Sequence, residues 1–155
     1  MRRFALHRRT GALLLAVLLA LLLTLTGVTA QAEQSAAPAR IVYHINVDDP
    51  AHHLNALQYL ESHFEAVGAP GLEARVVLHG GGIHLLEYAH DNVELRGLVD
   101  VLKLQGVEFR LCGNTMESRG VRLDELYDAR PGDRVPSGLS ELMRLQREGY
   151  TYIKP

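Results

Sequence analysis

The sequence predicts an α/β domain with a mainly parallel sheet and helices on both faces, a three-layer α/β/α arrangement. Short segments rich in Val, Ile and Leu alternate with longer segments whose apolar residues recur every three or four positions. Gly, Pro, Asn and Asp separate these segments, as expected at turns and helix ends. The first apolar segment, 40–47, is almost continuous, which is typical of a strand buried on both faces.

The first 32 residues are expected to lie outside this domain. A basic start is followed by an apolar run over 12–25 and by Ala30-Gln31-Ala32, the three-part layout of a secretory signal peptide with cleavage after Ala32. The apolar run is shorter than the roughly 20 residues that span a membrane. We therefore expect a periplasmic protein without stable membrane insertion after cleavage; an uncleaved N-terminal anchor is the alternative.

Residues 33–40 are small and polar and are interpreted as a flexible lead-in to a single domain over 41–155. All 18 acidic residues follow Ala32, whereas four of the 16 basic residues precede it, so the exported domain is acidic. An acidic domain without a basic stripe has no general attraction to nucleic acid, which excludes that class of partner.

The first half of the domain is expected to contain two strands and one helix. Asp49 and Pro50 suit the cap and the first turn of a helix over 51–67. That helix carries one apolar stripe, formed by Leu54, Leu57, Leu60, Phe64 and Val67. A strand over 72–78 follows the stop at Gly68, while the apolar stretch 83–88 does not distinguish helix from strand.

The second half repeats the alternation. Asn92 is expected to cap one helix and Ser137 another, whose inward residues would be Leu139, Leu142, Met143 and Leu145. The expected elements are a helix over 92–105, a strand over 107–111, a brief helix over 116–119, a turn over 123–127, a short strand at 135, a helix over 138–148 and a strand over 150–154.

Polar segments follow three of the predicted strands. Because ligands bind beyond the carboxyl ends of parallel strands, these segments are the expected site. Its candidate residues are Asn46 after the first strand, His79, Gly80, Gly81 and Gly82 after the second, and Cys112, Gly113, Asn114 and Thr115 after the third.

Cys112 is the only cysteine and is the candidate reactive group. An exported protein with one cysteine has no internal disulfide, so the thiol is buried and inert, paired between chains, or reactive. We expect Asn114 to cap the following helix with Glu117 in a capping box, and the helix N-terminus to lower the thiol pKa. The alternative is a cysteine that serves only as a small buried hydrophobe.

The other motifs argue against a cofactor. The glycine triplet permits close backbone approach or positive φ but lacks the pattern of a phosphate loop or dinucleotide fingerprint, and a tight turn is its alternative interpretation. The histidines do not match a compact zinc spacing, so no metal site is expected. Neither a Gly-x-Ser-x-Gly elbow nor a Cys-x-x-Cys pair occurs.

Three segments resemble the DsrE/DsrF-like family. Val107–Met116 is similar to its Val-x-Phe-x-x-Cys-x-Asn-Thr-Leu signature, and Val76–Gly82 to its Val-Val-x-His-Gly-x-Gly turn. Val135–Pro155 resembles the exported single-domain branch, formerly treated as a domain of unknown function. The resemblance covers about Arg40 to Pro155 and implies a flavodoxin-like sandwich that assembles as a trimer or hexamer.

The resemblance also implies a function. Cys112 would accept a persulfide from a sulfur donor and pass the sulfur to an acceptor, either a small thiol or a carrier protein. His79 would orient the donor or shuttle a proton, and whether the protein is a sulfurtransferase-like enzyme or only a carrier stays open. The alternative is a non-catalytic oligomeric module that binds a small ligand or protein and has an unreactive cysteine.

Overall fold

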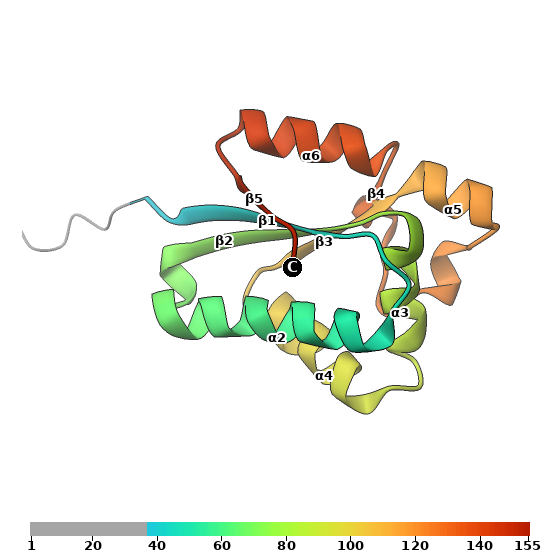
Figure 1. The fold of residues 1–155 in the computed structure, drawn as a ribbon, viewed down its shortest axis with the longest axis horizontal. Helices are drawn as coiled ribbons and strands as arrows, with labels where there is room; N and C mark the ends of the chain where they lie inside the picture. Colours follow the sequence, from blue (N-terminus) through green and yellow to red (C-terminus); the bar gives the residue numbers. More distant parts are fainter. Residues whose placement is uncertain (1–36) are drawn as a thin grey trace, which may run out of the picture. The chain divides into compact units, whose positions relative to one another are not determined.

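The computed structural model describes residues 37–155, which form one compact unit; the predicted signal peptide and residues 33–36 of the lead-in lie outside them. Five parallel strands form one sheet in the order β4-β3-β2-β1-β5 (Figure 1). The strands are β1 (Ala39–Ile45), β2 (Leu72–Leu78), β3 (Glu108–Cys112), β4 (Arg134–Val135) and β5 (Thr151–Ile153). The predicted α/β fold with a parallel sheet is confirmed.

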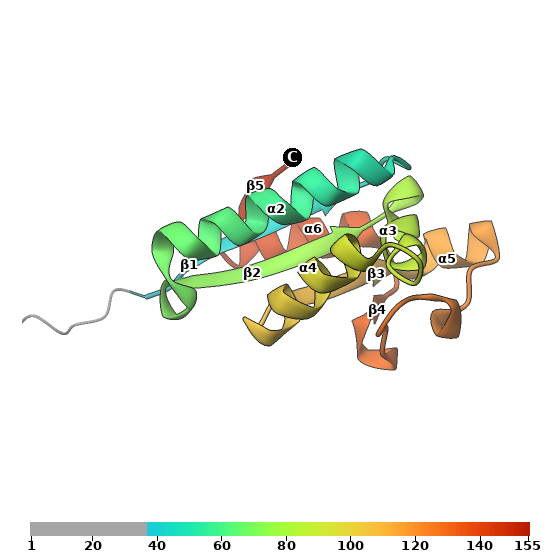
Figure 2. The same cartoon turned by 90° about the horizontal axis from the view of Figure 1, so that it is seen from below.

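Helices cover both faces of the sheet, as the alternation of segments predicts. One face is covered by α2, α3 and α4, and the opposite face by α6 alone, while α5 continues from the end of β3 (Figures 1 and 2). The helices are α2 (Pro50–Val67), α3 (His84–Tyr88), α4 (Val93–Leu104), α5 (Gly113–Arg119) and α6 (Gly138–Arg147). The stretch 83–88, left open by the sequence, is mostly α3.

Three predicted caps set the starts of the long helices. The Asp49 carboxylate accepts from the N–H groups of Ala51 and His52, with Pro50 at the first helical position. Asn92 accepts from Leu95 N–H at the start of α4, and Ser137 accepts from Ser140 N–H at the start of α6. These caps supply partners for backbone donors that a helix cannot satisfy internally.

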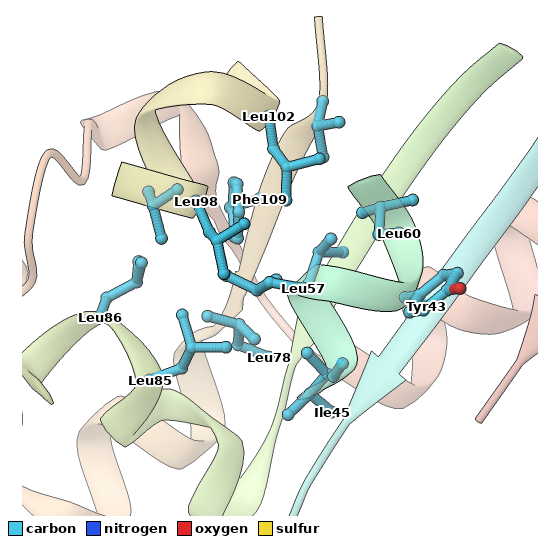
Figure 3. Packing of buried hydrophobic residues seen from close by; sticks show 14 of the residues in the cluster. Tyr43, Ile45, Leu57, Leu60, Leu78, Leu85, Leu86, Leu98, Leu102 and Phe109 are labelled. Atoms are coloured by element: carbon cyan, nitrogen blue, oxygen red, sulfur yellow. The ribbon is translucent and has the colours of Figure 1, made fainter. Parts of the chain in front are cut away.

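The main core lies between the sheet and α2, α3 and α4. Figure 3 shows leucines of these three helices packed against strand side chains. The labelled core residues are Leu57, Leu60, Leu85, Leu86, Leu98 and Leu102 from the helices and Tyr43, Ile45, Leu78 and Phe109 from the strands. This cluster supplies most of the apolar burial that stabilises the fold.

The α6 face is held differently. Its apolar cluster is small, consisting of Val42, Val77, Leu142, Leu145 and Tyr150. Beside it, Arg75 lies 3.0 Å from both Glu73 and Glu108, and the buried Glu141 of α6 accepts two hydrogen bonds from Arg144 at 2.8 and 2.7 Å. The Arg144 side chain holds the pKa of Glu141 below its usual value despite burial. A few apolar contacts and an ionic layer therefore seat α6 on the sheet.

Two side chains predicted to point inward from α6 do not. Leu139 and Met143 are each 54 % exposed. The inward stripe of α6 instead consists of Gly138, Glu141, Leu142 and Leu145, a three- and four-residue spacing that leaves neighbouring positions about 100° away. The predicted stripe of α2 also ends early, because Val67 lies in the last turn and is exposed.

The glycine turn after β2 packs directly against the end of β1. His79 N–H donates to the Ile45 carbonyl and Gly81 N–H to the Asn46 carbonyl, both at 3.1 Å. A β-carbon at Gly82 would overlap the Ile45 carbonyl oxygen. Close backbone packing therefore accounts for this glycine.

Replacing Gly82 by Ala tests this packing. The added methyl group meets backbone that cannot move freely, so we expect a loss of about 1–3 kcal/mol or more in the free energy of unfolding. Urea denaturation measures it. The matched control is Gly97→Ala on the exposed side of α4, where a β-carbon meets open space and should stabilise the helix by about 0.5–1 kcal/mol. Equal stability of both variants would contradict the packing argument.

Candidate functional site

The predicted convergence of strand ends occurs at β2 and β3. Leu78 is paired with Leu111, so the next residues, His79 and Cys112, are neighbours across the two strands. The start of α6 covers both: a β-carbon at Gly138 would lie 3.1 Å from the Cys112 β-carbon and 3.2 Å from that of His79. The cysteine, the histidine and the N-terminus of α6 thus meet at one point.

Cys112 is a free, buried cysteine that is 2 % exposed. Burial raises the pKa of its thiol, but the Thr115 hydroxyl and the neighbouring backbone N–H groups, that of Gly138 foremost, outweigh this effect, so the pKa is lowered. The donors come from α5 and from the start of α6. Their sum favours a thiolate, the reactive form of cysteine.

Thr115 links the cysteine to the glycine turn. Gly80 has a positive φ of 56°, and its N–H donates to the Thr115 hydroxyl oxygen at 3.0 Å. Because that oxygen already accepts, the hydroxyl proton is free to point at the Cys112 sulfur. These groups form a series that runs from the Gly80 N–H through the Thr115 hydroxyl to the Cys112 sulfur, and each hydrogen bond polarises the next one.

The predicted cap at the start of α5 is wrong. The helix begins at Gly113, so Cys112 itself occupies the cap position and Asn114 lies in the first turn. Asn114 N–H donates to the Pro136 carbonyl at 3.2 Å, and Glu117 pairs with Arg134 rather than closing a capping box. The β4–α6 loop replaces the side-chain cap, a long-range contact that local sequence does not reveal.

Other predicted site residues lie at the same edge of the sheet with partners of their own. The Asn46 side chain accepts a hydrogen bond from Lys154. Gly113 lets the β4–α6 loop approach, since a β-carbon there would lie 3.0 Å from the Val135 carbonyl. A role for Asn46, Gly81, Gly82 or Gly113 in binding a substrate stays a prediction.

Sequence reasoning missed His44. It lies on β1 opposite Val77, on the face of the sheet that α6 covers. Its Nδ1 is 2.8 Å from the Tyr152 hydroxyl, and its ring centroid is 5.7 Å from that of His79. Burial, with the charge of Lys154 and His79 nearby, lowers the pKa of His44 to about 4. Alternation along β1 was the available signal, because it places His44 and Asn46 on one face.

A surface hollow of about 390 Å³ adjoins the loop over Cys112 and is lined by Asn114, Glu117, Pro131, Arg134, Val135 and Pro136. Within residues 37–155, no three His, Cys, Asp or Glu side chains are arranged to hold a metal ion. In the same range, no helix combines the length and apolar character needed to cross a bilayer.

A protein-family model and two solved structures match the described domain. The model of the DsrE/DsrF-like family matches residues 42–155, and the chain belongs to this family. Its fold is similar to that of MTH1491 from Methanobacterium thermoautotrophicum, a protein of unknown function, with 30 % identity and a TM-score of 0.64 over 76 % of this chain and 99 % of that one.

The fold is also similar to that of the YchN protein from E. coli, with a TM-score of 0.58 and 18 % identity over 76 % of this chain and 99 % of the other. At that identity the similarity concerns the fold alone. No curated protein matched the sequence. The family membership and the flavodoxin-like α/β fold that the sequence predicted are therefore confirmed.

Thr115→Val tests the activation of the thiol. Loss of the hydroxyl donor should raise the pKa of Cys112 and slow alkylation by iodoacetamide at pH 7 about tenfold, the effect of one hydrogen bond to a charged group. The pH dependence of the alkylation rate measures it. Thr115→Ser keeps the hydroxyl and should react at nearly the natural rate. Indistinguishable profiles for the Val and Ser variants would show that the hydroxyl plays no part.

Proposed function

We propose that this domain carries sulfane sulfur as a persulfide on Cys112. The observation that supports this function is a buried sulfur whose thiol pKa is lowered by the Thr115 hydroxyl and neighbouring backbone N–H groups, although burial alone would raise it. An inert structural cysteine needs no such donors, because a neutral thiol is readily buried. Membership of the DsrE/DsrF-like family and the cysteine signature support the same function.

The chemistry is a pair of sulfur transfers. After the thiol proton passes to water, the Cys112 thiolate attacks the outer sulfur of a donor R–S–S⁻. A new S–S bond forms on Cys112, the donor S–S bond breaks, and its electron pair leaves on R–S⁻. In the return step an external thiolate attacks the outer sulfur and releases the Cys112 thiolate, so no oxidant is consumed.

Burial of the sulfur bears on the choice of partner. Cys112 lies beneath the loop that runs from Pro136 to Gly138, and this loop also donates to the sulfur. A small donor or a slender thiol reaches such a sulfur with less rearrangement than a folded carrier protein. The proposed partners are therefore small sulfane-sulfur and thiol compounds.

The same burial favours a second candidate function. A thiol that is 2 % exposed also suits a non-catalytic module in which Cys112 never reacts and the strand-end crevice binds a small ligand or protein. The two functions differ in whether the sulfur of Cys112 can be modified in the folded protein.

Location and assembly belong to the proposal as well. The signal-peptide pattern over 1–32 supports export to the periplasm. A homo-oligomer, a trimer or a hexamer, is supported by the exposed apolar side chains on the outer surface of α6, Leu139 and Met143.

Intact-mass measurement after incubation with polysulfide tests the carrier function. We expect a gain of one sulfur atom that a reductant removes, and no gain for Cys112→Ser. A folded protein that gains no sulfur and also resists alkylation at Cys112 would establish the binding module instead.

The oligomer is tested by Met143→Lys. A charge on the outer face of α6 should lower the mass measured by light scattering, whereas Ser140→Lys, on an exposed position of the same helix, serves as the control. A monomeric natural protein would overturn the proposed assembly without affecting the sulfur chemistry.

A further inference from the structure

Two buried histidine nitrogens near Cys112 have no hydrogen-bond partner among residues 37–155: Nε2 of His44 and Nδ1 of His79. A buried polar atom without a partner destabilises the fold. The two rings are neighbours, with centroids 5.7 Å apart and planes inclined by 38°. Two adjacent nitrogens of this kind indicate a place for a polar atom that the described chain does not supply.

The His44 ring is fixed from the side of β5. The residue is 6 % exposed, and its Nδ1 is hydrogen-bonded to the Tyr152 hydroxyl at 2.8 Å. Tyr152 is paired with Val42 across β1 and β5, whereas His79 follows β2 on the other side of β1. Nε2 is the other ring nitrogen, and it is buried beside the His79 ring without a partner among the described residues.

His79 connects this nitrogen pair to the sulfur. All four side chains lie on the α6 face, but they are staggered along the strands. Cys112 and His79 directly follow the paired residues Leu111 and Leu78. His44 is paired with Val77, two residues before His79, and Tyr152 is paired with Val42. Gly138 packs against the β-carbons of both Cys112 and His79, at 3.1 and 3.2 Å. The four side chains thus form a diagonal row across the α6 face, in which Cys112 and His79 lie at the start of α6, His44 lies beside His79, and Tyr152 contacts His44.

The ionisation of the row favours a neutral donor. The charged and titratable groups near His44 are Lys154 and Tyr152 on the C-terminal segment and His79, which follows β2. Burial, followed by the charges of Lys154 and His79, lowers the pKa of His44 to about 4, so its imidazole is neutral at physiological pH. If the Tyr152 hydroxyl donates to Nδ1, the single imidazole proton resides on Nε2, facing the cysteine side.

We propose that His44 and His79 bind the outer sulfur of the Cys112 persulfide, with Tyr152 as a positioning residue that sets the His44 tautomer. This inference rests on the proposed carrier function. The outer sulfur extends about 2.0 Å beyond the cysteine sulfur and carries negative charge, so it needs hydrogen-bond donors in a buried site. A neutral imidazole N–H supplies one without transferring its proton to the anion, and it holds the outer sulfur in place until an external thiolate attacks that sulfur in the return transfer.

The variants His44→Phe, His44→Gln and Tyr152→Phe test the row, each made in the protein expressed from the full-length sequence. The matched control is His63→Phe, which breaks a similar contact, that of His63 Nδ1 with the Tyr43 hydroxyl at 3.2 Å, on the α2 face of the sheet. Each protein is treated with EDTA, loaded with polysulfide and freed of excess. The rate at which the extra sulfur mass is lost, and the pH dependence of persulfide alkylation, are then measured.

We expect His44→Phe to shorten the lifetime of the bound sulfur about tenfold or more, as for loss of one hydrogen bond to a charged group, and to move the alkylation profile to higher pH. The bound sulfur should live longer in His44→Gln, which retains an N–H donor, than in His44→Phe. The lifetime in Tyr152→Phe should lie between those in His44→Gln and the natural protein. Equal lifetimes and equal pH profiles for the natural protein and all three variants would overturn the proposed binding of the outer sulfur by the two histidines.

Failure of the natural protein to load sulfur would overturn the carrier function itself, a distinct outcome. A separate readout tests His44 without sulfur. In the unfolded chain His44 is protonated below about pH 6.5, whereas in the folded protein it is protonated only below about pH 4. The free energy of unfolding should therefore decrease as the pH is lowered from 6.5 to about 4. The fall should be smaller in His44→Gln and unchanged in His63→Phe; if His44→Phe does not fold, His44→Gln and Tyr152→Phe carry both measurements.

Discussion

The contact between the glycine turn and the end of β1 determines the geometry of the site. Because Gly81 and Gly82 lack side chains, the turn lies against the backbone of residues 45–48, which fixes the path of the chain immediately after His79. Gly80 then directs its N–H at Thr115, and Thr115 directs its hydroxyl at Cys112. A packing constraint two strands away from the cysteine is thus transmitted to its sulfur through two hydrogen bonds.

The polar groups nearest Cys112 are neutral. The donors around Cys112 are a hydroxyl and backbone amides, and the nearby imidazole of His44 is kept neutral by burial. Elsewhere on the same face of the sheet, charge is compensated by charge, as where Arg75 lies between Glu73 and Glu108. Fixed dipoles stabilise an anion in a buried place without a counter-ion that could compete for it.

Sequence reasoning identified what depends on local pattern. The strands, the caps at Asp49, Asn92 and Ser137, and the placing of His79 and Cys112 at one edge all follow from periodicity and the rules of parallel sheets. Sequence reasoning failed where contacts between distant residues determine the local structure. The cap expected at Asn114 is replaced by the Pro136 carbonyl, 22 residues away in the chain.

The orientation of α6 and the environment of His44 were not predicted, because both depend on contacts with residues that are distant in the sequence. Leu139 and Met143 look like core residues, but Glu141 turns inward because Arg144 and Arg110 are there to meet it. The His44 ring is hydrogen-bonded to Tyr152, which lies on a neighbouring strand but almost at the end of the sequence.

That last pairing links reactivity to the completion of folding. Within residues 37–155 the strand β5 is the last element and β1 is the first, so their pairing joins residues separated by most of the domain. Contacts of such high sequence separation close late, since the chain must lose the most entropy to make them. A nascent or nicked domain that lacks β5 therefore has the cysteine but lacks Tyr152, the hydrogen-bond partner of His44. The environment of the site is complete only after the last strand has docked.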